Sequence, residues 1–205
     1  MSAQRERSRA ALKLQKEFKK LSDALQNDPK LGVAARPLTD NDLMHWQALI
    51  IGPENSPFAD AWFELSIEFC DKYPHKPPKV RFAHAMFHPN IYTNGSICLD
   101  ILQDKWSPVY QLRTVLVSIQ SLLDDPNPNS PANVDAAKVY DTDAGQYSEQ
   151  VRATIVAAGR DKTPLPQWYL DMLPSKEKED AAGSATNTVI GVCDTVPTQH
   201  MAIDQ

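Results

Sequence analysis

The residues best suited to chemistry lie in one polar, irregular stretch near the middle of the chain. It contains His88, Asn90 and Cys98, in that order. The pair Asn94-Gly95 is typical of a tight turn, which would fold the stretch back so that Asn90 and Cys98 meet. An unpaired cysteine is most often a buried core residue. One that follows a turn in a polar loop is a candidate nucleophile, which would act through its thiolate.

The elements that must position this stretch follow from the spacing of apolar residues. Leu14, Phe18, Leu21 and Leu25 form one stripe of an amphipathic helix, which we expect to end at Asp28-Pro29. The other expected elements are strands over 44–51, 62–69 and 80–82, an irregular segment over 86–109, and helices over 111–123, 132–140 and 143–158, with Ser130 as N-cap of the second of these helices. This order indicates an α+β fold with an antiparallel meander.

Composition excludes several classes of protein. The 205 residues carry a net charge of −5, which argues against a general nucleic-acid binder. No window approaches the roughly 18 apolar residues of a transmembrane helix, and the charged N-terminus is unlike a secretory signal. The widely spaced Cys70, Cys98 and Cys193 predict neither a disulfide framework nor a metal site. We therefore expect a protein of the cytoplasm and nucleus that does not bind membranes.

The chain divides near residue 160. Residues 161–205 hold 3 of the 21 basic and 7 of the 26 acidic side chains, and include a polar stretch of low complexity. We predict a folded core over 1–160 and a mildly acidic, mostly disordered tail over 161–205. The one apolar part of the tail is Leu165–Leu173, which is either a docking motif or, as we favour, a segment packed on the core.

The segment from Phe87 to Asp100 resembles the active-site signature of the ubiquitin-conjugating enzymes. The likeness extends over about residues 8–158 and includes these further blocks: His45-Trp46 with Gly52-Pro53, Tyr73-Pro74-His75-Lys76-Pro77-Pro78, Trp106-Ser107-Pro108, and Asp125 to Asn133. It implies the ubiquitin-conjugating (UBC) fold, with an N-terminal helix, a four-stranded antiparallel meander, an active-site loop and C-terminal helices. The runs at 119–123 and 128–133 resemble the subclass that acts in post-replication DNA repair and histone monoubiquitination.

The resemblance implies that Cys98 accepts the C-terminus of ubiquitin as a thioester. A lysine amine or a ligase cysteine then takes the acyl group. No Lys, Arg or second His lies within five residues after Cys98, and Asp100 is close. An adjacent acid disfavours the thiolate. A carrier fits this setting better than a cysteine hydrolase, whose activating base would also activate water.

The same resemblance assigns roles to the neighbours of Cys98. Asn90 would donate to the oxyanion, would hold the loop through backbone hydrogen bonds, or would do both. His88 and Pro89 would be structural, with a general base as the less favoured role for His88. Tyr92 and Ser130 would line the groove for the acceptor lysine, where phosphorylation of Ser130 could add charge. Asp100 would orient the acceptor or be solvated surface.

Partner surfaces are implied in the same way. A RING-type ligase and the ubiquitin-activating enzyme would contact these residues: Arg5, Arg9, Lys13, His75 and Pro108. Ala34 stands where many relatives have a serine at a non-covalent ubiquitin site, which leaves the use of that site open. We expect a monomer that acts on protein substrates without direct nucleic-acid binding. It should need no cofactor or metal, since ATP is consumed by the activating enzyme.

Two other functions stay open at this point. One is a catalytically silent ubiquitin-binding scaffold, although such variants usually lack the cysteine. The other is a carrier of a ubiquitin-like modifier. The SUMO carrier has a two-residue insertion between its active site and the tryptophan, and residues 100–106 here read DILQDKW without one. That favours ubiquitin.

Overall fold

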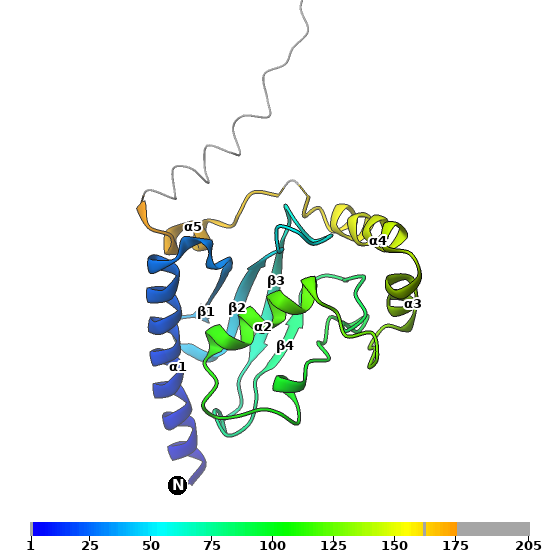
Figure 1. Cartoon of the computed structure of the whole chain (residues 1–205). Coiled ribbons are helices and arrows are strands. Elements are labelled where there is room, and N and C mark those ends of the chain that lie inside the picture. Colours follow the sequence, from blue (N-terminus) through cyan, green and yellow to red (C-terminus); the bar gives the residue numbers. More distant parts are fainter. Residues whose placement is uncertain (1, 162, 176–205) are drawn as a thin grey trace, which may run out of the picture.

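A four-stranded antiparallel sheet organises the protein, whose computed structural model describes residues 2–161 and 163–175. Its strands are β1 (Val33–Thr39), β2 (Asp42–Ile51), β3 (Trp62–Glu68) and β4 (Lys79–Phe82), and they lie side by side in chain order (Figure 1). The predicted α+β meander is thereby confirmed. The spacing of apolar residues missed β1, which contains Pro37; an edge strand tolerates proline because one row of its backbone groups is unpaired.

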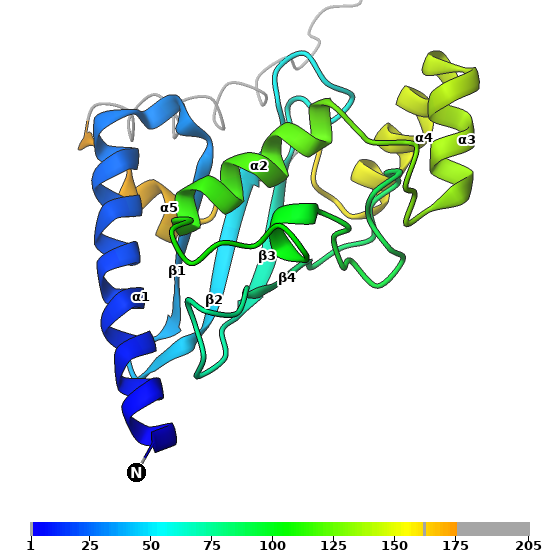
Figure 2. The same cartoon turned by 60° about the horizontal axis from the view of Figure 1, so that its bottom comes forward.

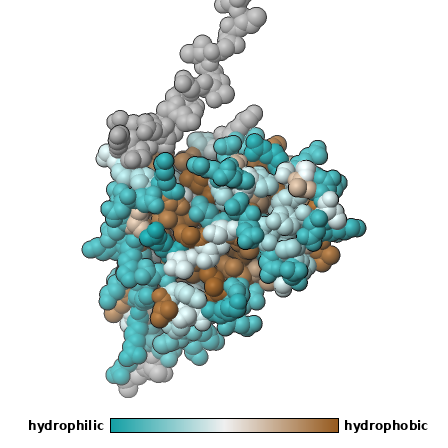
Figure 3. All heavy atoms as spheres, in the orientation of Figure 1, coloured by the Kyte–Doolittle hydropathy of each residue, from teal (hydrophilic) through white to brown (hydrophobic). Residues whose placement is uncertain are grey.

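Helix α1 (Ser2–Asn27) packs beside the sheet through the predicted stripe. Leu14, Leu21 and Leu25 are fully buried, whereas the outward surface of the helix is mostly hydrophilic (Figure 3). The helix ends before Pro29, which begins the short 3-10 helix η1 (Pro29–Leu31). Neither α1 nor any other helix among the described residues has the length and apolar character needed to span a bilayer.

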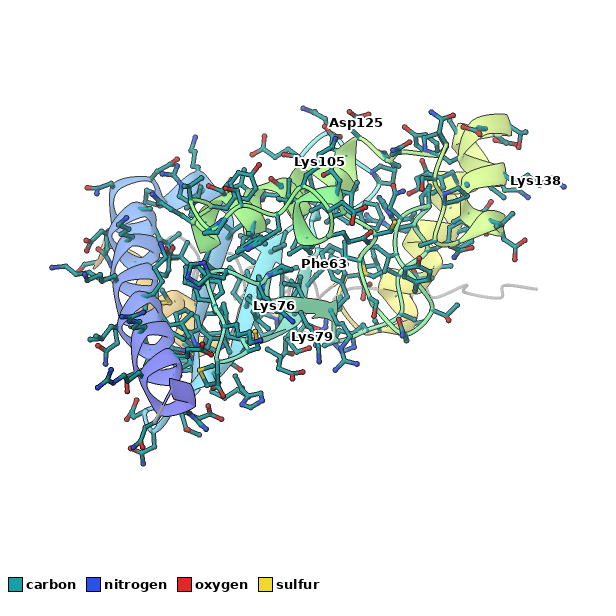
Figure 4. The ribbon with its side chains drawn as sticks, turned by 90° about the horizontal axis from the view of Figure 1, so that it is seen from below. Phe63, Lys76, Lys79, Lys105, Asp125 and Lys138 are labelled. Carbon is teal, nitrogen blue, oxygen red and sulfur yellow. The ribbon has the colours of Figure 1, made fainter. Side chains whose placement is uncertain are left out.

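Helix α2 (Leu112–Asp124) crosses the inner face of the sheet (Figure 2). Phe63 lies within the main core, whereas Lys138 points outward at the far end of the molecule (Figure 4). A buried carboxylate joins α1 to α2. Glu17 accepts a hydrogen bond from the backbone N–H of Leu112 at 2.9 Å and pairs with Lys13 at 2.6 Å. One unsatisfied donor at the start of α2 is thus capped from another helix.

Helices α3 (Val134–Thr142) and α4 (Ala144–Ala157) form the end of the molecule farthest from α1 (Figure 1). The prediction that Ser130 caps α3 was wrong. Asn133 is the N-cap, and its side chain accepts from the N–H of Ala136 at 3.1 Å. The backbone before it is held elsewhere, because the N–H groups of Ala132 and Asn133 both donate to the carbonyl oxygen of Pro89. The helix therefore starts two residues later than expected.

The short helix α5 (Gln167–Met172) lies in the segment predicted as a tail. It packs on the outer face of the sheet, opposite α2 (Figure 2). The interpretation that Leu165–Leu173 packs on the core is thus confirmed. Residues 176–205 of the predicted tail, which include Cys193, lie outside the described residues.

Candidate active site

The active-site loop, residues 86–109, folds back at the predicted turn. The N–H of Cys98 donates to the carbonyl of Asn90 at 2.8 Å, and that of Tyr92 to the carbonyl of Ser96 at 2.9 Å. Gly95 has φ +81°, and a Cβ there would lie 2.2 Å from the carbonyl oxygen of Phe82. Only glycine fits both this conformation and this close approach to β4. The turn therefore brings Asn90 and Cys98 together.

His88 is fully buried and bridges two backbone groups. Its Nε2–H donates to the carbonyl of Leu122 at 2.8 Å, which leaves Nδ1 to accept from the N–H of Asn90 at 2.9 Å. Burial lowers the pKa of His88 to about 4, so the ring is neutral near pH 7. Because both ring nitrogens are engaged, the geometry fits the structural role better than the general base.

Asn90 ties the active-site loop to the segment that precedes α3. Its side chain is 1% exposed. The amide nitrogen donates to the carbonyls of Asn127 at 2.7 Å and Ser130 at 3.4 Å, and the amide oxygen accepts from the N–H of Asn127 at 2.8 Å. Both N–H donors are thus engaged in this structure. The arrangement matches the loop-holding role, and donation to an oxyanion would require one of these bonds to open.

Cys98 is half-buried beside the side chain of Gln103, which was not among the predicted site residues. The amide nitrogen of Gln103 lies 3.9 Å from the Sγ atom of Cys98. Gln103 is uncharged, so it can orient the sulfur without acting as a base. The 3-10 helix η2 (Asp100–Leu102) turns the chain and brings Gln103 back toward the thiol. A thiol whose contacting side chain is an uncharged amide suits an acyl carrier, since an amide cannot take a proton from water as the activating base of a hydrolase would.

The charge of Asp100 is partly offset by Lys105. The Nζ of Lys105 lies 2.8 Å from Oδ2 of Asp100, and this pairing lowers the pKa of the carboxyl. Lys105 is seven residues after Cys98 in the sequence, and the turn after η2 brings it back, since its N–H donates to the carbonyl of Asp100 at 3.0 Å. The carboxylate of Asp100 is therefore paired with a cation that its nearest neighbours in sequence did not indicate.

The other predicted groove residues lie at the surface. Tyr92 is 45% exposed and belongs to the same turn as Gly95. Ser130 is exposed, and its carbonyl is one of the acceptors of the Asn90 amide. Asn90 is thus the link between the loop of Cys98 and the segment of Ser130. Among the described residues, no three His, Cys, Asp or Glu side chains gather to hold a metal ion.

The predicted partner residues are only partly brought together. Arg9 and His75 line one groove of about 400 Å³ between α1 and the loop before β4. Arg5 is exposed one helical turn before Arg9 and lines an open hollow on α1 with it, whereas Pro108 is exposed in the segment before α2. Lys13 is half-buried and committed to Glu17.

A second groove lies beside β4. It is lined in part by the exposed Cys70 and by Lys76 and Lys79, which lie near each other in Figure 4. Both lysines are exposed, so the rim of this groove is basic.

Comparison with known proteins gives a consistent result. The family model described as "Ubiquitin-conjugating enzyme" matches residues 13–155. "Ubiquitin-conjugating enzyme E2 1" of Caenorhabditis elegans is 51% identical over 143 residues, which cover 70% of this chain and 72% of that protein. "Ubiquitin-conjugating enzyme E2 2" of Trichoderma harzianum is 49% identical over 152 residues, or 74% and 97% of the two chains. "Ubiquitin-conjugating enzyme E2 3" of Arabidopsis thaliana is 54% identical over 127 residues, or 62% and 84%.

Proposed function

From the premise that the chain belongs to the ubiquitin-conjugating enzyme family, we propose that Cys98 is the residue that carries ubiquitin. The family makes the protein a thioester-forming acyltransferase whose partners are ubiquitin, an activating enzyme and ligases. The observation that supports Cys98 is its place after the fold-back at Asn90, where it is half-buried and its Sγ lies beside the uncharged amide of Gln103. In the first step its thiolate attacks the thioester carbonyl on the activating enzyme, whose own thiolate leaves.

In the second step a neutral lysine amine attacks the carbonyl of the Cys98 thioester. The C–N bond forms, the C–S bond breaks, and the Cys98 thiolate leaves while the amine loses its proton. The ordinary pKa of lysine, about 10.4, leaves only about one amine in 10³ neutral at pH 7.4. Desolvation in a groove lowers that pKa. The family resemblance assigns this groove to Tyr92 and Ser130, with Asp100 to orient the amine, and Tyr92 and Ser130 are exposed and so open to an approaching lysine.

Asn90 is a positioning residue in this scheme. By holding Asn127 and Ser130 it fixes one wall of the lysine groove relative to Cys98. Ser130 is exposed, so a kinase could reach its hydroxyl. A phosphate would add about −1.5 to −2 charges at the groove and favour an approaching lysine.

The finer assignments rest on the sequence. The runs at 119–123 and 128–133 support the subclass of post-replication DNA repair and histone monoubiquitination, and with it a place in both cytoplasm and nucleus. The ligase would be of the RING type, with Arg9 and His75 supported as contacts by their shared groove. The enzyme would act as a monomer on protein substrates without binding nucleic acid or membranes. It would need no cofactor, since ATP is consumed by the activating enzyme.

A non-reducing gel after mixing the protein with activating enzyme, ATP and ubiquitin tests the role of Cys98. We expect a band one ubiquitin heavier that thiol removes and that is absent in Cys98→Ala. Cys98→Ser should form an ester that resists thiol. Cys70→Ala serves as the matched control and should behave as the wild type. A wild-type band that survives in Cys98→Ala would refute the assignment. If no band forms with any modifier, the protein would be a catalytically silent scaffold. If a band forms with SUMO alone, the modifier that it carries would be SUMO and not ubiquitin.

A further inference from the structure

The outer face of the sheet, on the side opposite α2, carries an apolar row where a surface sheet would be polar. The strand register pairs Ala34 with Leu49 and Ile51 with Trp62, and the charged Glu64 lies on the other side of Leu49 at the border of this apolar area. Side chains alternate between the two faces of a sheet, so these residues point away from the main core. Ala34 and Leu49 are nevertheless fully buried.

The C-terminal segment, residues 163–173, covers this face. Tyr169 is 1% and Leu173 6% exposed, and they form a second core with Leu25, Ala34, Leu49 and Trp62. The family model ends at residue 155. The cover is therefore an addition to the part of the chain that defines the family. Ala34, where the sequence resemblance implies a non-covalent ubiquitin site, lies beneath it.

Side chains of the domain fasten the cover along its length. The indole N–H of Trp62 donates to the carbonyl of Thr163 at 2.9 Å. The side-chain amide of Gln26 donates to the backbone carbonyl of Met172 at 2.6 Å. Between these two points the guanidinium of Arg36 lies 5.1 Å from the ring centre of Trp168. The cover thus has a definite register on the sheet.

The sheet does not depend on the cover for its hydrogen bonds. The backbone N–H groups of α5 and its C-cap that form hydrogen bonds donate within the segment, as from Tyr169 to Pro166 and from Leu173 to Leu170. The strand pairs β1–β2 and β2–β3 are complete without it. Detachment would therefore break apolar contacts and the side-chain hydrogen bonds of Trp62 and Gln26 but would leave the sheet intact.

We propose that residues 163–173 are an intramolecular ligand that closes the outer face of the sheet to a second protein, non-covalently bound ubiquitin. In the closed state, ubiquitin finds Ala34 and Leu49 buried. In the open state, it meets an apolar surface with Trp62 at its border. The proposal rests on the family assignment but not on the role of Cys98. It makes the C-terminal segment the element that sets whether the face is available.

The test is an NMR titration of the ¹⁵N-labelled full chain with unlabelled ubiquitin, without activating enzyme or ATP. We expect no shift of the Ala34 and Leu49 amides in the wild type. In Tyr169→Asp, which places a charge under the cover, both amides and the Trp62 indole N–H should shift and saturate. Asp171→Asn is the matched control, because Asp171 is exposed on the same helix. It should behave as the wild type.

Each outcome decides the proposal. Ubiquitin shifts at Ala34 and Leu49 in the wild type would overturn it, as would an opened cover that still binds no ubiquitin. A Trp62 indole signal that is the same in free Tyr169→Asp as in the free wild type would show that the buried Tyr169 does not hold the cover, and this result too would overturn the proposal. Thioester formation on Cys98 shows that the variant is folded, and failure of that reaction alone would count against the proposed role of Cys98. Trp168→Ala, at a half-buried position, provides a milder second variant.

Thermal unfolding gives an independent measure of the cover. Truncation of a buried aromatic side chain to alanine in a domain of this size lowers Tm by about 5–15 °C. We expect a decrease in this range for Tyr169→Ala in the full chain. A Tm equal to that of the wild type would mean that the segment does not pack as an integral part of the domain.

Discussion

The active-site loop and the C-terminal segment both lack long regular elements, yet different forces hold them. In the loop, the anchors are buried polar side chains, His88 and Asn90, which bond to backbone groups of distant segments. In the C-terminal segment, residues 163–173, the anchors are Tyr169 and Leu173, which are buried among apolar side chains. The loop is fixed mainly by directed hydrogen bonds. The C-terminal segment is fixed mainly by contact area, with the side-chain hydrogen bonds of Trp62 and Gln26 near its two ends.

This difference suits what each region has to do. A hydrogen bond constrains distance and angle, so a set of them fixes the loop of Cys98 relative to the segment of Ser130. Apolar contact is not directional, and it is regained when a different apolar surface replaces the first. A reacting thiol needs the first kind of support. A cover that leaves and returns needs only the second.

The largest expected effect is that of removing the polar anchor. Asn90→Ala removes the three hydrogen bonds that its side chain forms with the backbone of Asn127 and Ser130, and each contributes a net of about 0.5–1.5 kcal/mol. We expect the free energy of unfolding to fall by about 2–4 kcal/mol. Lysine transfer should slow by at least about tenfold, since a small misplacement of the groove already reduces the rate. Urea unfolding and single-turnover discharge to lysine measure the two effects.

The control for this experiment is Asn129→Ala, because Asn129 is exposed in the same segment. It should leave both quantities close to wild type. The thioester itself should still form in Asn90→Ala, because the proposed first step does not need the wall of the lysine groove. Unchanged stability together with slow lysine transfer would contradict the loop-holding role and favour direct donation to the oxyanion.

The second prediction concerns the pH dependence of the loop. The pKa of His88 is lowered from 6.5 to about 4 in the folded protein, so the unfolded chain binds the proton more tightly. Stability should therefore be unaffected by this group above pH 6.5 and fall as the pH drops from 6.5 toward 4. The total loss from His88 would be about 3 kcal/mol.

Urea unfolding at a series of pH values, with the NMR titration of the His88 ring, measures this effect. The C-terminal segment contains no histidine, so its opening should contribute nothing to the loss through this group. His75→Gln is the control, since His75 is exposed and should leave the slope unchanged. A His88 ring that titrates near 6.5 would show that the polar anchor is open to solvent.

Local signals in the sequence predicted the parts of both regions that depend on neighbouring residues. The Asn94-Gly95 turn brought Asn90 and Cys98 together, and the apolar pattern of Leu165–Leu173 indicated packing on the core. The contact of Glu17 with the start of α2 was missed because it joins segments 95 residues apart, and no spacing encodes that placement. The contact of Gln103 with Cys98 is local, but it depends on the turn of η2, which the sequence did not indicate.

Where local signals compete, the prediction was wrong. Ser130-Pro131 is a common start of a helix, but the carbonyl of Pro89 binds the next two N–H groups, and Asn133 caps α3 instead. The strand that contains Pro37 was hidden for a similar reason, since proline counts against a strand until its edge position is known.

The smallest expected effect is that of the contact between Arg36 of β1 and Trp168 of the cover. The guanidinium of Arg36 over the ring of Trp168 should contribute about 0.5–1 kcal/mol at this partly exposed site. A double-mutant cycle with Arg36→Met and Trp168→Leu, followed by urea unfolding, isolates that coupling energy. Lys16→Met with Trp168→Leu is the control pair, since Lys16 lies exposed on α1 and should show no coupling. A coupling energy as large as the effect of Asn90→Ala would mean that the cover, too, depends on one directed contact, and it would then be a fixed part of the domain like the loop.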